Sequence, residues 1–146
     1  MYWLTPKLRA YFLPMAVISD VRVAIVDDNP QFGEALSVLL ELEPDMRVVA
    51  LLGDGKSATV HAANECADVY LIDFRLPDMN GAEATASVLT ECACTSVIAL
   101  SAAVTDPDAK AVLDAGALEC FSKDRDLDAL VESIRAAAAR KLSVEA

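Results

Sequence analysis

The chain has 146 residues, 55% of them hydrophobic and 24% charged, a composition typical of one globular domain and not of a disordered or fibrous protein. The formal net charge is −11, and no stretch is rich in Lys and Arg. Nucleic-acid binding needs a positive footprint, so this charge argues against direct binding of DNA or RNA. No apolar run reaches the ~20 residues that a membrane span requires.

Residues 1–20 combine Lys7 and Arg9 with the apolar run YFLPMAVIS, a pattern that superficially resembles a secretory signal peptide. Pro14 interrupts the run, and no small-residue cleavage site follows it. We therefore interpret this segment as a poorly ordered N-terminal extension. A start at Met15 would give a more compact beginning.

From residue 21 onwards, short apolar runs alternate with segments of helical periodicity. The apolar runs predict strands at residues 21–26, 48–52, 69–72, 97–100 and 118–121. The periodicity predicts helices from Pro30 to before Pro44, and at about 56–66, 81–91, 106–116 and 126–141. This alternation, at the spacing of βαβ units, predicts a parallel sheet with helices on both faces.

Local signals mark several of the expected helix ends. Asn29 is suited to cap the helix that begins at Pro30. Asp106 followed by Pro107 is a cap-then-proline start, and Gly116 is expected to end the same helix.

The cysteines do not follow a recognisable functional spacing. Cys66, Cys92, Cys94 and Cys120 form neither a C-x-x-C redox pair nor a zinc motif. Each lies in a periodic apolar context, so we expect four free thiols in a reducing cytosol. His61, the only histidine, is expected to be a surface or half-buried helix residue and not a ligand or base.

Polar side chains stand at the carboxyl ends of the predicted strands. Asp27 and Asp28 follow the first strand, Asp73 the third, Ser101 the fourth and Lys123 the fifth. Ligands of doubly wound α/β sheets bind at this edge, so we expect these side chains to converge. One Asp at a strand end usually serves as a turn or cap residue, whereas the ordered set of five indicates a shared site.

The chemistry of this set favours a phosphoryl group and a hard cation. Three carboxylates held together repel one another unless a cation intervenes, and oxygen ligands of this kind suit Mg²⁺. Asp73 would be a nucleophile that forms an acyl phosphate, and Lys123 a point charge for the phosphoryl oxygens. The glycine-rich nucleotide-binding motifs are absent from the sequence.

The motifs AIVDDNP, LIDFRLPDMNG, IALSA and AGALECFSK resemble, in order and spacing, those of the receiver domain of two-component response regulators, over about residues 21–140. The resemblance implies a flavodoxin-like doubly wound α/β fold with five helices and a five-stranded parallel sheet in the order 2-1-3-4-5. We place this domain at residues 21–141, between the extension at 1–20 and a tail at 142–146. The segment AGALECFSKDRDLDALVESIRAAAAR is most similar to receivers that precede a helix-turn-helix output domain.

The resemblance also implies roles for the converging residues. Asp73 would accept a phosphoryl group from a sensor histidine kinase or a histidine phosphotransfer protein, with Lys123 and Ser101 assisting. The implied Mg²⁺ ligands are Asp28, Asp73, the backbone carbonyl of Arg75 and, through water, Asp27. Such a domain is a cytoplasmic phosphoprotein and not an enzyme, and it switches binding to an output protein or to a missing output domain. Formation of a homodimer is left open.

Two positions depart from the family pattern. Cys120 stands where receivers usually have Tyr or Phe, and Phe121 is expected to point into the core on the opposite face of the strand. Ser101 replaces the commoner Thr but keeps the hydroxyl. The alternative function is therefore a receiver-like interaction module that works without phosphorylation. A hydrolase of the haloacid-dehalogenase type is disfavoured, because Arg75 occupies the place of its second acid.

Overall fold

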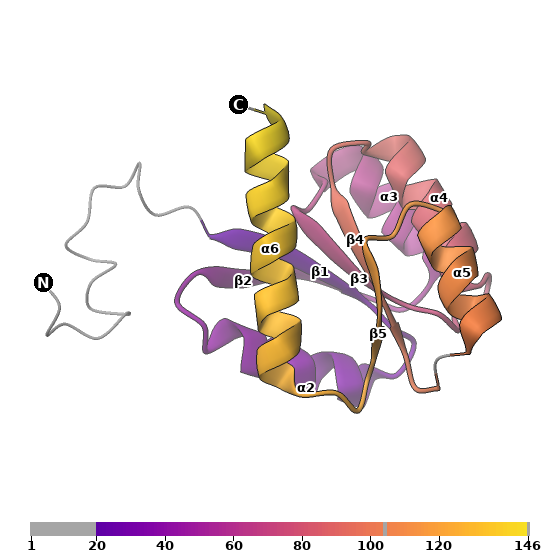
Figure 1. Cartoon of the computed structure of the whole chain (residues 1–146), viewed down its shortest axis with the longest axis horizontal. Helices are drawn as coiled ribbons and strands as arrows, with labels where there is room; N and C mark the ends of the chain where they lie inside the picture. Colours follow the sequence, from indigo (N-terminus) through magenta and orange to yellow (C-terminus); the bar gives the residue numbers. More distant parts are fainter. Residues whose placement is uncertain (1–19, 104, 146) are drawn as a thin grey trace, which may run out of the picture.

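The computed structural model describes residues 20–103 and 105–145, in which five strands and five helices alternate along the chain (Figure 1). The strands are β1 (Val21–Val26), β2 (Met46–Leu52), β3 (Val69–Asp73), β4 (Ser96–Ser101) and β5 (Glu119–Ser122). The helices are α2 (Pro30–Glu41), α3 (Gly55–Glu65), α4 (Gly81–Glu91), α5 (Asp106–Asp114) and α6 (Leu127–Glu145). The predicted N-terminal extension, except for Asp20, lies outside the described residues.

The strands form one parallel sheet in the order β2-β1-β3-β4-β5. This is the predicted flavodoxin-like topology, and the prediction is confirmed. The chain steps from β1 outward to β2 and then crosses to β3, so the direction of winding reverses beside β1. The carboxyl ends of β1 and β3 therefore flank the switch point, where doubly wound proteins bind their ligands.

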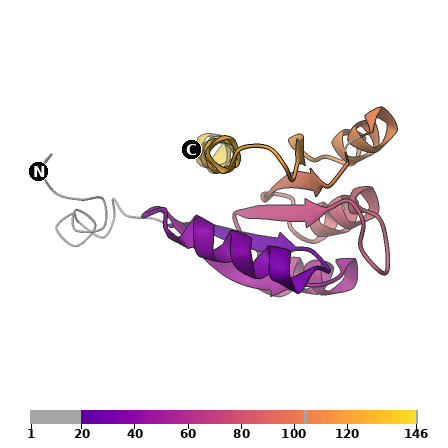
Figure 2. The same ribbon diagram turned by 90° about the horizontal axis from the view of Figure 1, so that it is seen from below.

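Helices cover both faces of the sheet, with α2 and α6 on one face and α3, α4 and α5 on the other (Figures 1 and 2). Successive side chains of β1 point to opposite faces of the sheet, so this strand contributes to the hydrophobic core on both faces. Val23 and Ile25 pack with α2 and α6, whereas Ala24 and Val26 pack toward the other three helices. Every residue of β3 is buried, as expected for a central strand covered on both sides.

The helix ends agree with the sequence signals at two places and differ at two others. Asn29 caps α2 through its side-chain oxygen, and Gly116 follows α5 with a φ of 115°. The cap of α5 is Thr105 and not Asp106, which is already helical. Helix α6 continues to Glu145, beyond its predicted end near Lys141. Among the described helices, none has the length and apolarity to cross a bilayer.

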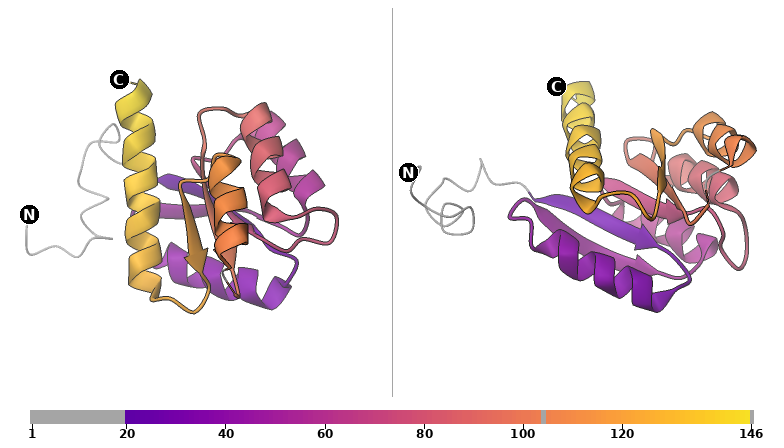
Figure 3. Two further views of the ribbon diagram at one scale, coloured as in Figure 1. Left: turned by 45° about the vertical axis from the view of Figure 1, so that its right-hand side comes forward. Right: turned by 60° about the horizontal axis from the view of Figure 1, so that its bottom comes forward.

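The expectation of four free thiols is wrong. Cys66 and Cys92 form a disulfide, and only Cys94 and Cys120 are free. The two bonded residues are the C-caps of α3 and α4, which lie side by side on one face of the sheet (Figure 3). They are 26 residues apart in sequence, so local spacing carried no sign of the pairing. His61 is half-buried on α3, as predicted, with Nδ1 2.7 Å from the hydroxyl of Tyr70.

Candidate functional site

Three carboxylates meet at the carboxyl ends of β1 and β3. Asp27 and Asp28 follow β1 and Asp73 ends β3, and one oxygen of each lies within 4.8 Å of the others. The side chains of Asp27 and Asp73 are 2% and 10% exposed, whereas Asp28 is open to solvent. The group is therefore closed on the side of Asp27 and Asp73 and open to solvent at Asp28, where a ligand can enter.

Lys123 projects into this group from the residue after β5. Its Nζ lies 2.6 Å from Oδ2 of Asp27 and 3.4 Å from Oδ2 of Asp73. The ammonium also stands 4.3 Å from the centre of the Phe32 ring on α2, a cation–π distance. Its backbone N–H donates to the carbonyl of Ser101 at 2.9 Å. Contacts of both its backbone and its side chain therefore hold Lys123 beside Asp27 and Asp73.

The electrostatics of the group favour an additional cation. Burial raises the pKa of the Asp73 carboxyl, Lys123 opposes that rise, and the neighbouring Asp27 adds to it. Three carboxylates and one ammonium leave two negative charges uncompensated. The donors are all oxygens, and the exposed Asp28 leaves space for water. This set fits a hard, hydrated divalent cation such as Mg²⁺.

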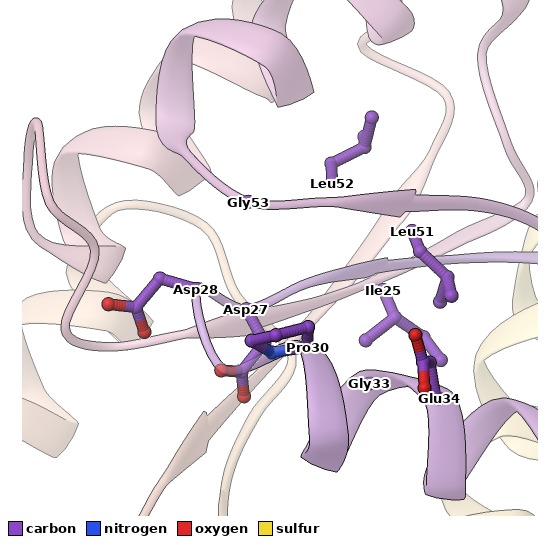
Figure 4. A pocket seen from close by; sticks show the side chains of 9 residues that line it. All are labelled: Ile25, Asp27, Asp28, Pro30, Gly33, Glu34, Leu51, Leu52 and Gly53. Carbon is purple, nitrogen blue, oxygen red and sulfur yellow. The ribbon is translucent and has the colours of Figure 1, made fainter.

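A pocket of about 270 Å³ opens beside Asp27 and Asp28, the two acids that follow β1 (Figure 4). It lies between the first turns of α2, at Pro30 and Gly33, and the end of β2, at Leu51 and Leu52. Asp73 and Lys123 do not line it, so the pocket borders the group of acids and does not enclose it.

The loop after Asp73 is held close to the strand. The backbone N–H of Arg75 lies 3.5 Å from Oδ1 of Asp73, and the N–H of Gly81 donates to the carbonyl of Phe74 at 2.6 Å. A Cβ on Gly81 would stand 2.7 Å from Cα of Phe74, closer than real contacts allow. Glycine is needed there because the backbone of the first turn of α4 passes directly over the end of β3.

Asp78 anchors the far side of this loop and was not singled out from the sequence. Its carboxylate accepts hydrogen bonds from the backbone N–H groups of Gly55 and Lys56, at 2.8 and 2.9 Å. These bonds, at the positive end of α3, lower the pKa of Asp78. The side chain of Met79 fills the space over Gly55. The dipeptide Pro77-Asp78 is typical of a turn, but it does not indicate which helix the acid will contact.

Ser101 lies at the end of β4, the strand next to that of Asp73. Its hydroxyl donates a hydrogen bond to the carbonyl of Ala103 at 3.0 Å and not to a residue of the acidic group. The predicted contact between this hydroxyl and a phosphoryl group therefore stays a prediction. Phe121 is buried on the side of α2 and α6, and Cys120 faces the opposite side. This confirms the expectation that Phe121 does not replace the aromatic residue missing at position 120.

The sequence profile described as the response regulator receiver domain matches residues 23–135. One curated relative is the nitrate/nitrite response regulator protein NarP of Escherichia coli, 37% identical over 124 residues that cover 85% of this chain and 58% of NarP. Another is the transcriptional regulatory protein DegU of Brevibacillus brevis, 32% identical, with 82% of this chain and 51% of DegU covered. The chain thus spans about half the length of these relatives.

Solved structures show the same likeness. The signal receiver domain of the putative response regulator NarL from Mycobacterium tuberculosis is 30% identical, with a TM-score of 0.78 over 83% of this chain and 98% of that domain. A two-component response regulator of the LuxR family from Aurantimonas sp. SI85-9A1 is 28% identical, also with a TM-score of 0.78, over 83% of this chain and 86% of that one.

Proposed function

The chain belongs to the response regulator receiver domain family, and we propose that it accepts a phosphoryl group on Asp73 from the phosphohistidine of a sensor kinase or a histidine phosphotransfer protein. One observation carries this proposal. The carboxylate of Asp73 ends a buried strand within 4.8 Å of two further carboxylates, and its Oδ2 is 3.4 Å from the ammonium of Lys123. The receiver domain itself would be residues 21–141, with residues 142–146 as its tail.

The transfer is a substitution at phosphorus. A carboxylate oxygen of Asp73 attacks the phosphorus atom, and the P–N bond to the donor histidine breaks. The electron pair of that bond stays on the imidazole, which takes up a proton, and an acyl phosphate forms on Asp73. Lys123 neutralises part of the charge on the phosphoryl oxygens, because its Nζ already stands between Asp27 and Asp73.

Asp28, Asp73 and the backbone carbonyl of Arg75 would hold Mg²⁺, with Asp27 bound through water. When bound, Mg²⁺ neutralises charge on the transferring group. The support for this assignment is the oxygen-only donor set, two of whose side chains are buried and one exposed. Asp27 already accepts a hydrogen bond from the ammonium of Lys123 at 2.6 Å, which favours an indirect role toward the metal.

The response to phosphorylation would begin at Ser101. Its hydroxyl exchanges the carbonyl of Ala103 for a phosphoryl oxygen, and the segment after β4 moves toward the site. Lys123 takes part, because its N–H is bonded to the carbonyl of Ser101. The change would reach α5, β5 and α6 and alter partner binding there, without the switch aromatic that Cys120 replaces.

The names of the curated relatives suggest what this switch would control. NarP and DegU are named as regulators, and the chain spans about half of each. We propose that the domain controls a downstream output protein, or a helix-turn-helix output domain, in the cytoplasm. The receiver would be a phosphoprotein and not an enzyme, and a homodimer would be one form in which it binds its target.

The test is phosphorylation of the full chain by acetyl phosphate with Mg²⁺, followed by intact-mass spectrometry and phosphate-affinity electrophoresis. The wild type should gain one hydroxylamine-labile phosphoryl group, and Asp73→Asn should gain none. Asp45→Asn, an acid at the other end of the sheet, is the control and should react as the wild type does. Equal modification of Asp73→Asn and the wild type would overturn the proposal.

A second candidate is an interaction module that works unphosphorylated, which Cys120 at the usual aromatic position favours. Binding of a purified output partner would then be the same for the wild type and Asp73→Asn, with or without acetyl phosphate. A change in affinity that appears only when the wild type is phosphorylated would exclude this candidate.

A further inference from the structure

Three of the four cysteines gather at the amino end of the sheet, opposite the acids. Cys66 is the C-cap of α3 and Cys92 the C-cap of α4, and the two form the disulfide. Both are half-buried, whereas Cys94, two residues further on, is a free and exposed thiol. We refer to these three residues as the thiol cluster.

The free thiol touches the disulfide. Sγ of Cys94 lies 3.6 Å from Sγ of Cys92, and a disulfide sulfur carries no hydrogen, so the proton in this contact belongs to Cys94. The backbone sets this distance, because the N–H of Thr95 lies 3.4 Å from the carbonyl of Cys92 and its hydroxyl donates to the carbonyl of Ala67 at 2.7 Å. A sulfur nucleophile is therefore held against one end of an S–S bond.

The surroundings of Cys66 suit a leaving thiolate. The guanidinium of Arg22 donates to the backbone carbonyl of Cys66 at 2.8 Å, which places a positive charge beside this residue. Sγ of Cys66 also lies 3.4 Å from the carbonyl of Ala67, which is an acceptor for the thiol proton once the disulfide has opened. The loops stay connected without the disulfide, since Thr95 and Ser96 both bond to the carbonyl of Asp68.

We propose that the thiol cluster is a thiol–disulfide exchange centre that makes the Cys66–Cys92 bond accessible to low-molecular-weight thiols. Cys94 loses its proton to solvent, and its thiolate attacks Sγ of Cys92. The Cys66–Cys92 bond breaks as the Cys92–Cys94 bond forms, and Cys66 leaves as a thiolate and takes up a proton. This step changes no oxidation state.

The external thiol acts in the second stage. Two thiol molecules reduce the Cys92–Cys94 disulfide, one through a mixed disulfide with the protein and the second by displacing it, and they leave as one oxidised dimer. The protein gains two thiols in return, so electrons and protons balance. In a reducing compartment disulfides are typically transient and redox-sensing, which is the use that such an exchange centre fits.

Cys120 provides a matched control within the chain. It lies on β5, half-buried, outside the thiol cluster. Burial, together with the charge of Asp108, raises the pKa of its thiol, which disfavours the reactive thiolate form. Comparing a variant at Cys94 with one at Cys120 therefore shows whether the reduction rate depends on the contact between Cys94 and the disulfide or only on the number of free thiols.

The test uses the full chain, purified in air and then treated with reduced glutathione. Samples are quenched with acid, alkylated and mapped by peptide mass spectrometry. Before glutathione is added, alkylation at neutral pH should label a fraction of Cys66 in the wild type and none in Cys94→Ser. With glutathione, the disulfide of the wild type should open about tenfold faster than that of Cys94→Ser. The reason is that the thiol of Cys94 attacks the disulfide at a higher effective concentration than the external thiol does. Cys120→Ser should react at the wild-type rate.

Several results would overturn the inference. One is an equal rate of reduction for the wild type and Cys94→Ser, and another is the complete absence of label on Cys66 in the untreated wild type. Four alkylated cysteines in the air-purified protein would show that the disulfide does not form. Cys94→Ala repeats the comparison without a new hydroxyl, and circular dichroism verifies that each variant is folded. The phosphorylation test on Asp73 has a different readout, so the two proposals can fail separately.

Discussion

At each end of the sheet, three acids surround one basic side chain, and the two groups differ chiefly in burial. At the carboxyl end, Lys123 stands among Asp27, Asp28 and Asp73. At the amino end, Arg135 of α6 forms ion pairs with Glu43, Asp45 and Glu132. The side chain of Asp73 is 10% exposed and that of Asp45 is 42% exposed.

The pKa shifts of the two groups run in opposite directions. The hydrogen bonds from Arg135 lower the pKa of Asp45 and raise the pKa of Arg135, so both charges are favoured there. At the other end, burial raises the pKa of Asp73 despite the nearby Lys123. The number of charges alone therefore does not make a site reactive. A buried carboxylate that its partner compensates only in part is the one that would be stabilised by an additional cation.

The largest effect that we expect at the carboxyl end of the sheet concerns metal binding. Asp28→Asn should weaken Mg²⁺ binding on the order of 100-fold, because it removes one unit charge within a few ångströms of the cation. Glu43→Gln removes the same charge from the group around Arg135 and should leave the affinity unchanged. Isothermal titration calorimetry measures both. Equal losses for the two variants would mean that net charge alone governs binding.

Breaking the disulfide should affect the amino end most strongly. Reduction of Cys66–Cys92 frees a loop of 26 residues. The chain-entropy relation gives a loss of about 3.5 kcal/mol in the free energy of unfolding for a loop of this length. Urea denaturation with and without dithiothreitol measures the difference. The control is oxidised Cys94→Ser, which keeps the bond and should match the oxidised wild type. Identical curves with and without reductant would contradict the expectation.

A glycine pair tests how tightly the carboxyl end is packed. Gly81→Ala should cost about 2 kcal/mol of stability, because the new methyl group meets the backbone of Phe74 at 2.7 Å and the carbonyl of Asp73 at 3.0 Å. Gly53→Ala, at the end of β2, meets nothing within 4 Å and should cost far less. Chemical denaturation of both variants measures the two costs, and equal costs would show that the backbone around Gly81 can move aside.

The smallest expected effect is a difference in how stability depends on pH. The raised pKa of Asp73 means that its stabilising contribution is present below its usual value of 3.8 and is lost as the pH rises through the folded-state pKa. Without metal, Asp73→Asn should therefore raise the Tm at pH 7 by a few degrees, and the gain should vanish toward pH 4.

Asp45 should show the opposite sign in the same experiment. Its pKa is lowered, so its contribution is present above 3.8 and is lost as the pH falls through the folded-state pKa. Asp45→Asn should lower the Tm at pH 7, and the deficit should shrink on acidification. Differential scanning fluorimetry across this pH range measures both variants. Shifts of the same sign would show that burial does not distinguish the two groups.

The sequence predicted those features that local pattern determines. The runs at β1 and β3 are apolar because both faces of the sheet are covered, and an acid at the end of each run already indicated a common edge. The convergence of Asp27, Asp73 and Lys123 followed from topology alone. Their separation distances did not, since they depend on how Phe32 of α2 holds the lysine.

Features that depend on two distant segments escaped prediction. The Cys66–Cys92 bond requires the ends of α3 and α4 to meet, and no local spacing reports that meeting. The hydrogen bonds from the first turn of α3 to Asp78 also join two segments that are distant in sequence, so no local pattern predicted them. At Thr105 the signal was local, but two adjacent capping residues competed, and the hydroxyl of Thr105 took the position that the Asp-Pro pattern gave to Asp106.

The ion pair between Lys123 and Asp27 joins residues 96 positions apart. During synthesis the acids of β1 emerge long before the lysine that follows β5, so the charged pocket is completed only when the final strand has docked. A nascent or prematurely terminated chain therefore exposes carboxylates with no ammonium to balance them. If Asp73 is the phosphoryl acceptor, as proposed, phosphorylation would therefore require that the last strand has already folded onto the sheet.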